Sequence, residues 1–369
     1  MNIVLAGGGT AGHINPALSI AKTIKAKNPD SKILFIGNQN SLEEKLVKKA
    51  GFDIKFVKVS GLKRSLSIKN VKTLTNFLKS VNDCKKIIRD FGADAVIGTG
   101  GYVSGPAVYA AHLLKIKTAI HEQNAYPGIT SKFLSSFADV VFISFESSRK
   151  YFEKSKNVIL SGNPLDEQFL FNDKAQARKI LGIPDNAFYL LSFAGSLGAR
   201  EINKLFVDFI VRNAKNNDFL HTHATGGFGY SWMPNALKDK GFDINEKSNT
   251  TVVEYIYDMP LRLAASDLVI SRAGAITLGE LTAQGKASIL IPSPNVTHNH
   301  QYHNAMSLVN CGAAMILEEK DATVDKLYKM ALDIKNDPVL AKKLSDNAYS
   351  MAQLSATEVI YKNLFKLIK

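Results

Sequence analysis

The sequence predicts an α/β protein made of two doubly wound parallel-sheet domains of the Rossmann-like kind. Three observations predict this fold: a length of 369 residues, short apolar runs that alternate with longer helical segments, and a strand–glycine loop–helix beginning that occurs twice. At ~100–200 residues per domain, the length suggests two domains. The composition, 46% hydrophobic and 21% charged, is that of an ordinary globular protein and excludes disordered and collagen-like classes.

The first half opens with an apolar run at residues 2–6, which we expect to be a strand, followed by a glycine loop and a helix from about Asn15. Further apolar runs alternate with helical segments, a pattern typical of a parallel sheet covered by helices. These predicted strands are 32–36, 54–59, 94–98, 117–121, 139–143 and 157–161.

The second half begins again in the same way, with a strand at 188–194, a loop from Gly195 to Gly198 and a helix from Arg200. The later predicted elements are strands at 219–224, 251–254, 267–270, 287–291 and 313–317 and a helical segment at 339–368. We place the boundary between the domains near Gly162-Asn163-Pro164, because a residue before proline disfavours the continuation of regular structure.

Several classes of protein are excluded by simple features of the chain. Two stretches without charge, 95–114 and 287–317, contain glycine or proline breakers and are not expected to span a membrane. The chain begins without a basic and then apolar segment, so we expect no secretory signal. Cys84 and Cys311 lie far apart and outside any C-x-x-C motif, which fits a reducing cytoplasm.

The formal net charge of +13 lies entirely in the first half. Residues 1–162 hold 24 Lys and Arg against 11 Asp and Glu, whereas residues 163–369 hold 22 of each kind. We call residues 55–89 the basic strip, because ten basic residues stand there against Asp83 alone. They are Lys55, Lys58, Lys63, Arg64, Lys69, Lys72, Lys79, Lys85, Lys86 and Arg89.

The basic strip has three interpretations. It is compatible with the solvated face of an amphipathic helix. It is also compatible with docking on an anionic membrane surface, where each basic residue adds ~1 kcal/mol. Nucleic acid is the third, but the strip lacks interleaved aromatic residues and the chain shows no recognisable nucleic-acid module. We therefore favour a membrane surface and expect no nucleic-acid partner.

The first glycine loop, from Gly7 to Gly12, fits the G-x-G-x-x-G pattern, and Asp30 has about the spacing of a ribose-binding acid. Because Asp30 follows Pro29 in an expected loop, a nicotinamide or flavin cofactor is disfavoured. The loop still forms an anion site at a helix start. His13, at the end of the loop, is either held by the backbone or faces a cleft as a proton acceptor.

Two more loops of the first half follow predicted strands at their carboxyl ends, where open α/β sheets place ligand-binding groups. The first loop, 98–106, contains four glycines, which allow a ligand to approach the backbone closely. The second is His121-Glu122-Gln123-Asn124, which is either a polar loop or part of a site.

In the second half, residues 272–280 follow a predicted strand, and small residues ahead of a helix leave N–H groups that can hold a pyrophosphate. Glu280 is then either a ribose acceptor or a solvent-facing residue. His298, His300 and His303 have a spacing compatible with zinc. However, no carboxylate occurs from 287 to 317, and the neighbouring amides suit sugar hydroxyls better, so we expect no metal.

Together and in this order, the motifs resemble those of the MurG family, bacterial glycosyltransferases with the GT-B fold, over nearly the whole chain. The resemblance rests on Gly8-Gly9-Thr10-Ala11-Gly12-His13-Ile14-Asn15-Pro16, Gly98-Thr99-Gly100-Gly101-Tyr102, His121-Glu122-Gln123-Asn124, Gly162-Asn163-Pro164, Gly195-Ser196-Leu197-Gly198-Ala199, Arg272 to Glu280, and His300-Gln301.

The resemblance implies transfer of N-acetylglucosamine from UDP-N-acetylglucosamine to undecaprenyl-pyrophosphoryl-N-acetylmuramyl-pentapeptide. This step converts lipid I to lipid II in peptidoglycan synthesis, and so serves cell-wall biogenesis, cell shape and cell division. Two domains facing a cleft are implied: 1–163 meets the acceptor and the membrane, 164–349 binds the donor, and a helix at about 350–369 packs back on the first domain. The implied location is peripheral, on the cytoplasmic face of the bacterial inner membrane.

The resemblance also implies a set of site residues. The positions that match substrate contacts are Thr10, Ala11, Gly12, Asn124, Ser196, Ile256, Ala275, Ile276, Thr277, Leu278, Gly279, Glu280, His300 and Gln301. For an inverting displacement, His13 is the first candidate for the general base and Glu122 the second, and no cofactor is expected. The charge of the leaving UDP would be spread over the amides at 274–277 and 196–198.

The chain departs from the family pattern at two places. Ala11 stands where the family usually has glycine, and residues 165–168 lack the arginine that commonly follows Gly-Asn-Pro. Arg200 and Arg272 are candidates to replace that arginine. The alternatives to MurG activity are another GT-B enzyme (a lipid glycosyltransferase or a UDP-N-acetylglucosamine 2-epimerase), a non-catalytic nucleotide-sugar-binding subunit, and a nicotinamide-dependent oxidoreductase.

Overall fold

The computed structural model describes residues 1–59, 69–170, 173–195, 198–246 and 248–369. The chain divides into two compact units. The first unit is formed by Met1–Leu165 together with Gln353–Lys369, and the second by Asp166–Ala352. The predicted boundary at Asn163 and Pro164 lies beside the observed one.

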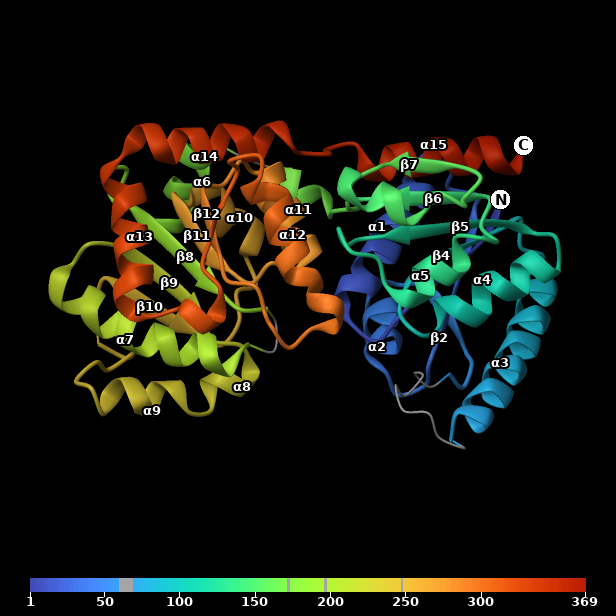
Figure 1. Cartoon of the computed structure of the whole chain (residues 1–369), viewed down its shortest axis with the longest axis horizontal. Helices are drawn as coiled ribbons and strands as arrows, with labels where there is room; N and C mark the ends of the chain where they lie inside the picture. Colours follow the sequence, from blue (N-terminus) through green and yellow to red (C-terminus); the bar gives the residue numbers. More distant parts are fainter. Residues whose placement is uncertain (60–68, 171–172, 196–197, 247) are drawn as a thin grey trace. The chain divides into compact units, whose positions relative to one another are not determined.

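The first unit contains a parallel sheet of seven strands in the order β3-β2-β1-β4-β5-β6-β7, with helices on both faces (Figure 1). The strands are β1 Asn2–Gly7, β2 Lys32–Gly37, β3 Asp53–Phe56, β4 Ala95–Gly100, β5 Lys117–Glu122, β6 Val140–Ile143 and β7 Val158–Leu160. The helices are α1 Ala11–Lys27, α2 Leu42–Lys49, α3 Lys69–Phe91, α4 Ser104–Leu113, α5 Ile129–Leu134, α15 Ala356–Ile368 and the 3₁₀ turn η1 Glu146–Tyr151.

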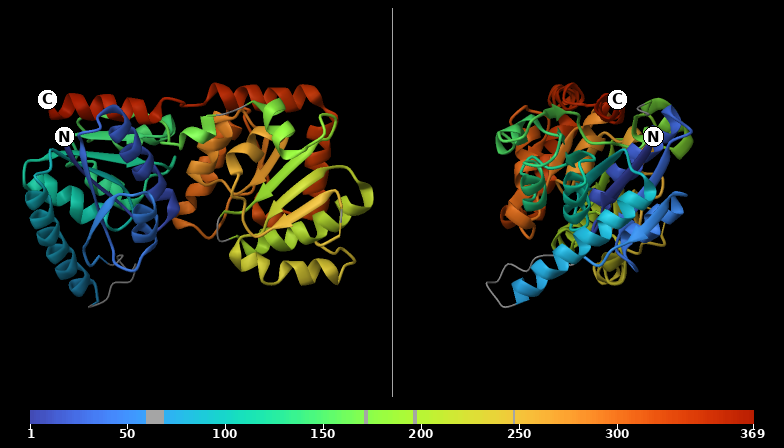
Figure 2. Two further views of the ribbon diagram at one scale, coloured as in Figure 1. Left: turned by 180° about the vertical axis from the view of Figure 1, so that it is seen from behind. Right: turned by 90° about the vertical axis from the view of Figure 1, so that its right-hand side faces the viewer.

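Alternate residues of β1 pack on opposite faces of this sheet. Val4 and Ala6 belong to a core closed by α3 and α4, whereas Ile3 and Leu5 belong to a core closed by α1 and α15. Strands covered on both faces are nearly continuously apolar, which explains why the sequence predicted β1, β2, β4, β5 and β6 as apolar runs, whereas the edge strand β3 is largely exposed. Seen from behind in Figure 2, α15 lies along α1, and both chain termini belong to this unit.

Helix α1 begins at Ala11, four residues earlier than predicted. The prediction put Pro16 in the first turn, because proline lacks the N–H that the helix interior needs. In the structure Pro16 is the sixth residue of the helix. His13 is therefore not at the end of a loop, as predicted, but in the first turn of α1.

The last predicted helical segment, 339–368, is broken in two. α14 ends at Ser350 in the second unit, and α15 begins at Ala356 in the first. Between them the chain passes from one unit to the other beside Gly162, where a Cβ would lie only 2.2 Å from Cβ of Gln353. Gly162 also has a left-handed φ of +82°, so this position admits only glycine without strain.

The second unit contains a parallel sheet of six strands in the order β10-β9-β8-β11-β12-β13. The strands are β8 Tyr189–Phe193, β9 Leu220–Ala224, β10 Thr250–Val253, β11 Leu268–Ser271, β12 Ser288–Leu290 and β13 Met315–Ile316. The helices are α6 Lys174–Leu181, α7 Arg200–Asn216, α8 Gly227–Tyr230, α9 Met233–Lys238, α10 Met259–Ala265, α11 Ala275–Ala283, α12 His300–Val309, α13 Val324–Asn336 and α14 Pro338–Ser350, with 3₁₀ turns η2 Glu167–Leu170, η3 Thr297–Asn299 and η4 Glu319–Asp321.

The predicted fold of two doubly wound parallel sheets is confirmed. In each sheet the strand order reverses at one point, between β1 and β4 in the first unit and between β8 and β11 in the second. Open α/β sheets bind ligands outside the carboxyl ends of the strands at such a switch point. Within the described ranges, no helix is both long and apolar enough to cross a membrane.

Candidate active site

The glycine loop that follows β1 lies against the loop that follows β4, at the switch point of the first unit. The Gly8 N–H donates to the Gly100 oxygen at 3.3 Å, and Thr99 Oγ1 donates to the His13 oxygen at 2.7 Å. A Cβ on Gly101 would lie 2.1 Å from the Gly8 oxygen. Two of the predicted glycine loops therefore meet, and close backbone contact requires glycine at Gly101.

The imidazole of His13 is held in one orientation. Its Nδ1 lies 3.1 Å from the Gly8 oxygen and 3.2 Å from Thr10 Oγ1. Because a carbonyl oxygen only accepts, Nδ1 carries the proton of the neutral ring and the basic lone pair is on Nε2. The opposite edge of the ring lies against Gly100, where a Cβ would be 2.5 Å from His13 Cδ2 and 3.0 Å from Nε2. The Nδ1-protonated tautomer is the one that a general base acting through Nε2 requires.

The start of α1 brings the other predicted residues of this loop together. Thr10 is the N-cap, and Ala11 and Gly12 are the first two helical residues. The Gly9 N–H donates to Oε2 of Glu43, a residue of α2 that the sequence did not single out. A loop amide that is bound in this way is not presented to a pyrophosphate, which argues against a dinucleotide at this position. The only sequence signal for Glu43 is its place in the first turn of a helix, which it shares with the solvated Glu44.

Glu122 is buried, 3% exposed, and its carboxylate organises its own loop. One oxygen accepts from the Asn124 backbone N–H at 2.9 Å and from Asn124 Nδ2 at 3.1 Å, and the other accepts from the Gly128 N–H at 3.1 Å. These three donors hold the carboxylate and direct it toward residues 124–128. This geometry favours His13 over Glu122 as the general base.

The remaining side chains of this motif join β5 to neighbouring strands. His121 Nε2 donates to the Gly162 oxygen at 2.9 Å, and Nδ1 accepts from Gln123 Nε2 at 3.0 Å. Gln123 Nε2 also donates to the Thr99 oxygen at 2.7 Å. Burial lowers the pKa of His121 to about 4, so the ring is neutral near pH 7. The motifs at 98–102, 121–124 and 162–164 thus form one hydrogen-bonded network.

In the second unit, the loop between β8 and α7 rests on the end of β9. Gly195 and Gly198 have left-handed φ angles of +84° and +78°, and the Gly198 N–H donates to the Gly195 oxygen at 3.0 Å. A Cβ on Gly198 would lie 2.0 Å from the Thr225 oxygen. The predicted donor contact Ser196 falls at 196–197, outside the described residues.

A chain of buried hydrogen bonds supports the same loop. Asn203 Nδ2 donates to the Thr225 oxygen at 2.8 Å, so Asn203 Oδ1 accepts from His223 Nε2 at 3.2 Å. His223 Nδ1 then accepts from Ser192 Oγ at 2.7 Å, and Ser192 Oγ accepts from His221 Nε2 at 2.7 Å. Burial lowers the pKa of His223 to about 3 and that of His221 well below its usual value. Both rings are neutral, and every proton in this series of hydrogen bonds has a defined position.

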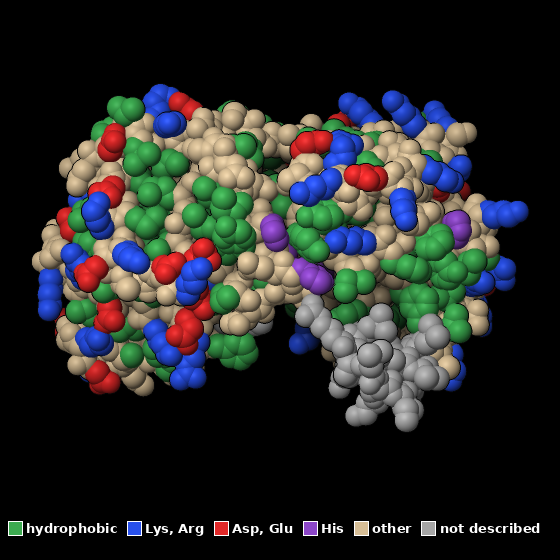
Figure 3. All heavy atoms as spheres, viewed as in Figure 1, with side chains coloured by type: hydrophobic (Ala, Val, Ile, Leu, Met, Phe, Trp, Pro, Cys, Tyr) green, Lys and Arg blue, Asp and Glu red, His purple; other side chains and the backbone are tan. Residues whose placement is uncertain are grey.

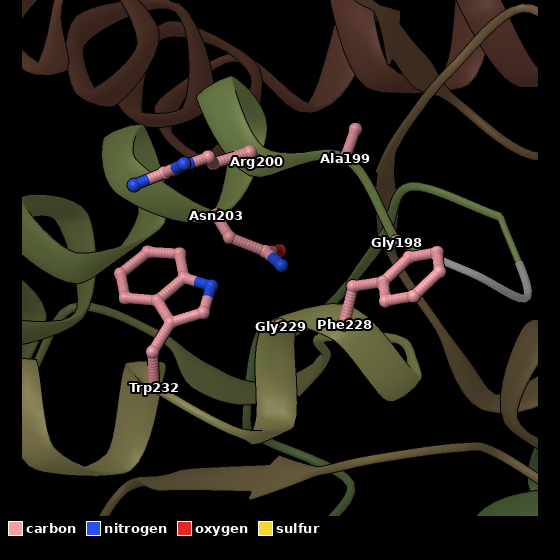
Figure 4. A pocket seen from close by; sticks show the side chains of 7 residues that line it. All are labelled: Gly198, Ala199, Arg200, Asn203, Phe228, Gly229 and Trp232. Carbon is pink, nitrogen blue, oxygen red and sulfur yellow. The ribbon is translucent and has the colours of Figure 1, made fainter.

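A cavity of about 320 Å³ opens beside Asn203, the end of this series of hydrogen bonds, between the start of α7 and the α8–α9 segment (Figure 4). It is lined by Gly198, Ala199, Arg200, Asn203, Phe228, Gly229 and Trp232. In Figure 4 the Asn203 amide points into the cavity, with the Phe228 and Trp232 rings on either side of it. Arg200 stands at the amino end of the 17-residue helix α7, where Glu201 of the same turn pairs with Lys204.

The loop between β11 and α11 forms the second half of this switch point. Gly274 is the N-cap of α11, and among the described side chains none caps this end or places an acid in its first turn. The N–H groups of Ile276 and Thr277 therefore favour an anionic ligand. Leu278 is fully buried and its N–H donates to the Gly274 oxygen at 3.0 Å, so this member of the predicted set packs the helix start.

Arg272 is committed to holding this unit together. Its Nη1 donates to the Ile291 and Pro292 oxygens, each at 3.1 Å, and its Nη2 pairs with the Glu319 carboxylate. Side chains of the pair are only 10% and 17% exposed. The expectation that Arg272 can replace the family arginine is therefore corrected, and Arg200 remains the candidate.

Two more predicted substrate contacts of the second unit are the acidic Glu280 and the apolar Ile256. Glu280 is partly buried in α11 beside Gly279, and desolvation raises its pKa to about 8. Ile256 is 5% exposed, between Tyr255 and Tyr257, which are 48% and 91% exposed. The backbone of this loop and the two tyrosine rings are thus the parts that a ligand can reach.

The last two predicted residues, His300 and Gln301, are the first two residues of α12 and bind the loop that precedes it. Gln301 Oε1 accepts from the Ser293 N–H at 2.9 Å, and His300 Nδ1 lies 2.9 Å from the Thr297 oxygen, to which it donates. The side chains of both residues therefore help to shape the loop. Across the described part of the chain, no group of three or more His, Cys, Asp or Glu is arranged to hold a metal ion.

Comparison with known proteins gives the family. Residues 3–143 match the glycosyltransferase family 28 N-terminal domain, and residues 189–360 match the glycosyltransferase family 28 C-terminal domain. A protein of Acetivibrio thermocellus named UDP-N-acetylglucosamine–N-acetylmuramyl-(pentapeptide) pyrophosphoryl-undecaprenol N-acetylglucosamine transferase is 42% identical over 369 residues, which are 100% of this chain and 99% of that protein. A Bacillus cereus protein with the same name followed by the number 1 is 43% identical over 369 residues, which are 100% of this chain and 100% of that protein. The chain belongs to the MurG family of glycosyltransferases.

Solved structures agree with this assignment. The crystal structure of Acinetobacter baumannii MurG is 26% identical, has a TM-score of 0.79 and covers 99% of both chains. A UDP-GlcNAc 2-epimerase from Neisseria meningitidis bound to UDP-GlcNAc is 14% identical with a TM-score of 0.67, and covers 99% of this chain and 100% of its own. The epimerase shares the fold alone. The MurG-family resemblance is confirmed, and the epimerase alternative receives no support beyond the fold.

Proposed function

We propose that this MurG-family chain transfers N-acetylglucosamine from UDP-N-acetylglucosamine to the N-acetylmuramyl sugar of lipid I, giving lipid II for peptidoglycan synthesis. The observation that carries the proposal is the 42–43% identity, over the full length, to transferases named for this reaction. The geometry is consistent with it, because each unit presents candidate residues at the switch point of its own sheet.

The second unit is proposed to hold the donor. The N–H groups at the start of α11 would receive the charge that develops on the diphosphate as UDP leaves. Glu280 would accept hydrogen bonds from the ribose, and the loop after β10 around Ile256 would contact the base. Arg200, at the first position of α7, is proposed to supply the positive charge that the missing arginine gives elsewhere in the family.

The first unit is proposed to bind the acceptor. His13 Nε2 would take the proton of the attacking hydroxyl, while that oxygen forms a bond to the anomeric carbon. The bond from the anomeric carbon to UDP breaks on the opposite face, its electron pair leaves with UDP, and the configuration inverts. The hydrogen bond from His13 Nδ1–H to the Gly8 oxygen keeps Nε2 in the accepting form before the reaction.

The direct test is transfer of radiolabelled N-acetylglucosamine from its UDP donor to a lipid I analogue, with His13→Ala beside the wild type. We expect labelled lipid II from the wild type, and a loss of about 10²–10⁴-fold in kcat for H13A, the usual contribution of a general base. UDP binding to H13A, measured by calorimetry, is the control for folding. Folded wild-type protein that yields no labelled product would refute the proposed reaction, and an H13A variant with full activity would refute the base.

We further propose that the first unit binds the anionic surface of the inner membrane from its cytoplasmic face. An aromatic patch formed by residues of α3, α4 and the α5 segment supports this proposal. Its side chains are Phe77, Leu78, Tyr109, His112, Leu113, Phe133 and Phe137. Leu78, Leu113 and Phe133 are 53%, 45% and 45% exposed. Figure 3 shows hydrophobic side chains gathered over these helices, with Lys and Arg beside them.

The basic strip lies next to the aromatic patch on α3. Lys79, Lys86 and Arg89 are exposed on this helix, whereas Lys63 and Arg64 lie outside the described residues. Each basic residue near an anionic bilayer contributes ~1 kcal/mol of attraction, and apolar side chains add to it by insertion at the interface. Apart from Phe77 of α3, the aromatic side chains of the patch come from α4 and the α5 segment rather than from the strip itself.

Vesicle co-sedimentation separates the two contributions. We expect the double variant K86E/R89E to lose binding to anionic vesicles, and Phe133→Ser to lose binding to vesicles of either charge. A Lys329→Glu variant, with its exposed side chain on α13 of the second unit, serves as the control for charge reversal. Equal binding of wild-type protein to neutral and anionic lipid would contradict an electrostatic role of the strip.

A further inference from the structure

One peptide group connects a buried carboxylate to the ring of His13. The Gly9 N–H donates to Glu43 Oε2 at 3.1 Å, and the Gly8 oxygen lies 3.1 Å from His13 Nδ1, which donates to it. The Gly8 C=O and the Gly9 N–H belong to the same peptide bond. Since C=O and N–H of a trans peptide point in opposite directions, Glu43 and His13 bind its two ends.

We propose that Glu43 is a positioning residue that acts on His13 through the Gly8–Gly9 peptide and fixes the imidazole in its Nδ1-protonated tautomer. The carboxylate, the peptide group and the imidazole form a relay in which the protein backbone replaces the direct carboxylate–imidazole contact of a catalytic triad. The kinetic part of this inference rests on the proposed transfer reaction, whereas the tautomer is a property of the free protein.

The burial of Glu43 strengthens its effect on His13 through the Gly8–Gly9 peptide group. The side chain is 2% exposed, and its hydrogen-bond partners within the described residues are two backbone groups, the N–H of Gly9 and that of Asn38, each at 3.1 Å. Where water is excluded, hydrogen bonds polarise one another along a chain. An acceptor on the Gly9 N–H therefore strengthens the Gly8 oxygen as an acceptor for His13.

The local backbone is shaped around this carboxylate. A Cβ on Gly8 would lie 2.8 Å from Glu43 Oε1, and a Cβ on Gly37 would lie 2.9 Å from Glu43 Cγ. The loop that follows β1 and the last residue of β2 thus each bring a glycine against one side chain of α2. A glutamate that only capped its own helix would need neither contact, as Glu44 shows by binding Asn40 and Lys48 at the surface.

The relay has a defined role in the proposed reaction. When Nε2 accepts the hydroxyl proton, the ring becomes a cation whose Nδ1–H still donates to the Gly8 oxygen. The polarised peptide stabilises that cation without moving, because its position is set by Glu43 before the reaction begins. Glu43 itself neither contacts the substrate nor exchanges a proton.

Glu43→Gln tests the relay, and Glu44→Gln is its matched control. The amide side chain introduced by E43Q has one accepting oxygen, so it keeps only one of the two backbone hydrogen bonds. E44Q removes the same charge one residue further along α2, where no peptide connects it to His13. We expect E43Q to lower kcat roughly 10-fold, the lower range for loss of an outer partner, with the KM for UDP-N-acetylglucosamine unchanged. E44Q should retain the wild-type kcat.

Two-bond ¹H–¹⁵N spectra of protein labelled at histidine nitrogen give a readout that does not depend on turnover, with the His13 signals assigned by their absence in H13A. We expect the neutral His13 ring to be protonated at Nδ1 in the wild type and in E44Q, and to shift toward Nε2 protonation in E43Q. A wild-type ring protonated at Nε2 would overturn the proposal even if E43Q fails to fold. Equal kcat and equal tautomer in E43Q and E44Q would overturn it as well. If the wild type transfers no sugar, the proposed function fails, and the spectra still decide the relay.

Discussion

The buried series of hydrogen bonds that links His221, Ser192, His223 and Asn203 makes Ser192→Ala an informative change in the second unit. Ser192 Oγ accepts from His221 Nε2 and donates to His223 Nδ1, each at 2.7 Å, and all three side chains are at most 1% exposed. The alanine removes both bonds at once. Each buried polar group left without a partner costs ~1–3 kcal/mol, so two groups predict a loss of about 2–6 kcal/mol in the free energy of unfolding.

This loss has two measurable consequences. For a unit of this size, each kcal/mol lowers Tm by about 2–4 °C, which thermal unfolding followed by circular dichroism detects. In addition, His223 no longer has a fixed position from which to hold Asn203, and Asn203 supports Thr225, on which the loop at Gly198 rests. We therefore expect a higher KM for UDP-N-acetylglucosamine.

Thr222→Val provides the matched control. Tyr189 donates to Thr222 Oγ1 at 3.0 Å between the same two strands, but on the opposite face of the sheet and away from the loop. T222V should lower Tm without raising the donor KM. The argument is refuted if S192A unfolds like the wild type, or if S192A and T222V change Tm and KM in the same proportion.

Four further results are expected. Gly100→Ala should lower kcat while UDP still binds, because the position has a φ of +104° and the new Cβ would lie 2.5 Å from His13 Cδ2; full turnover by G100A would contradict the packing of the ring. Glu319→Gln should cost about 3 kcal/mol in urea unfolding, since it removes the charge that balances buried Arg272; unchanged stability would show that the pair is not needed. Burial raises the pKa of Glu280 from 4.5 to about 8. Between these pH values the folded unit holds a proton that the unfolded chain releases, so the free energy of unfolding falls as pH rises. Glu280→Gln should remove this dependence on pH. Because a ribose that donates to Glu280 favours the carboxylate, UDP binding should release a proton below pH 8, which calorimetry in buffers of different ionisation enthalpy measures; release that persists in E280Q would place the titrating group elsewhere.

Much of the fold was predictable because its strands are buried on both faces. Such strands are continuous apolar runs, and the run at 2–6 became β1 with neighbouring residues in two different cores. The start of α1 was predicted wrongly, since the rule that proline belongs in a first turn fails where a helix tolerates it further in. The residue pattern alone missed the break between α14 and α15, because the break follows from the passage between units and not from local propensity; the family resemblance did imply a helix at about 350–369 that packs on the first unit.

The candidate site was predictable to the extent that it lies at strand ends. Gly100 and Glu122 end β4 and β5, and His13 stands in the helix turn just after β1, at the strand ends where doubly wound sheets gather ligand-binding groups. Glu43 was not predictable, because its partner Gly9 is 34 residues away and contributes only a backbone N–H. The roles of Ser192 and His223 were hidden for the same reason, since residues inside strands are indistinguishable by pattern from ordinary core positions.

The route of the chain sets the order in which the two units can be finished during synthesis. Ile360 and Leu364 of α15 are fully buried against α1 and the first sheet, although they are synthesised after the whole of the second unit. The second unit, an uninterrupted stretch, is complete once Ala352 has left the ribosome. The first unit emerges earlier but must wait, with one face of its sheet uncovered, until Gln353–Lys369 has emerged as well. The half of the molecule that is translated first is therefore the half that matures last.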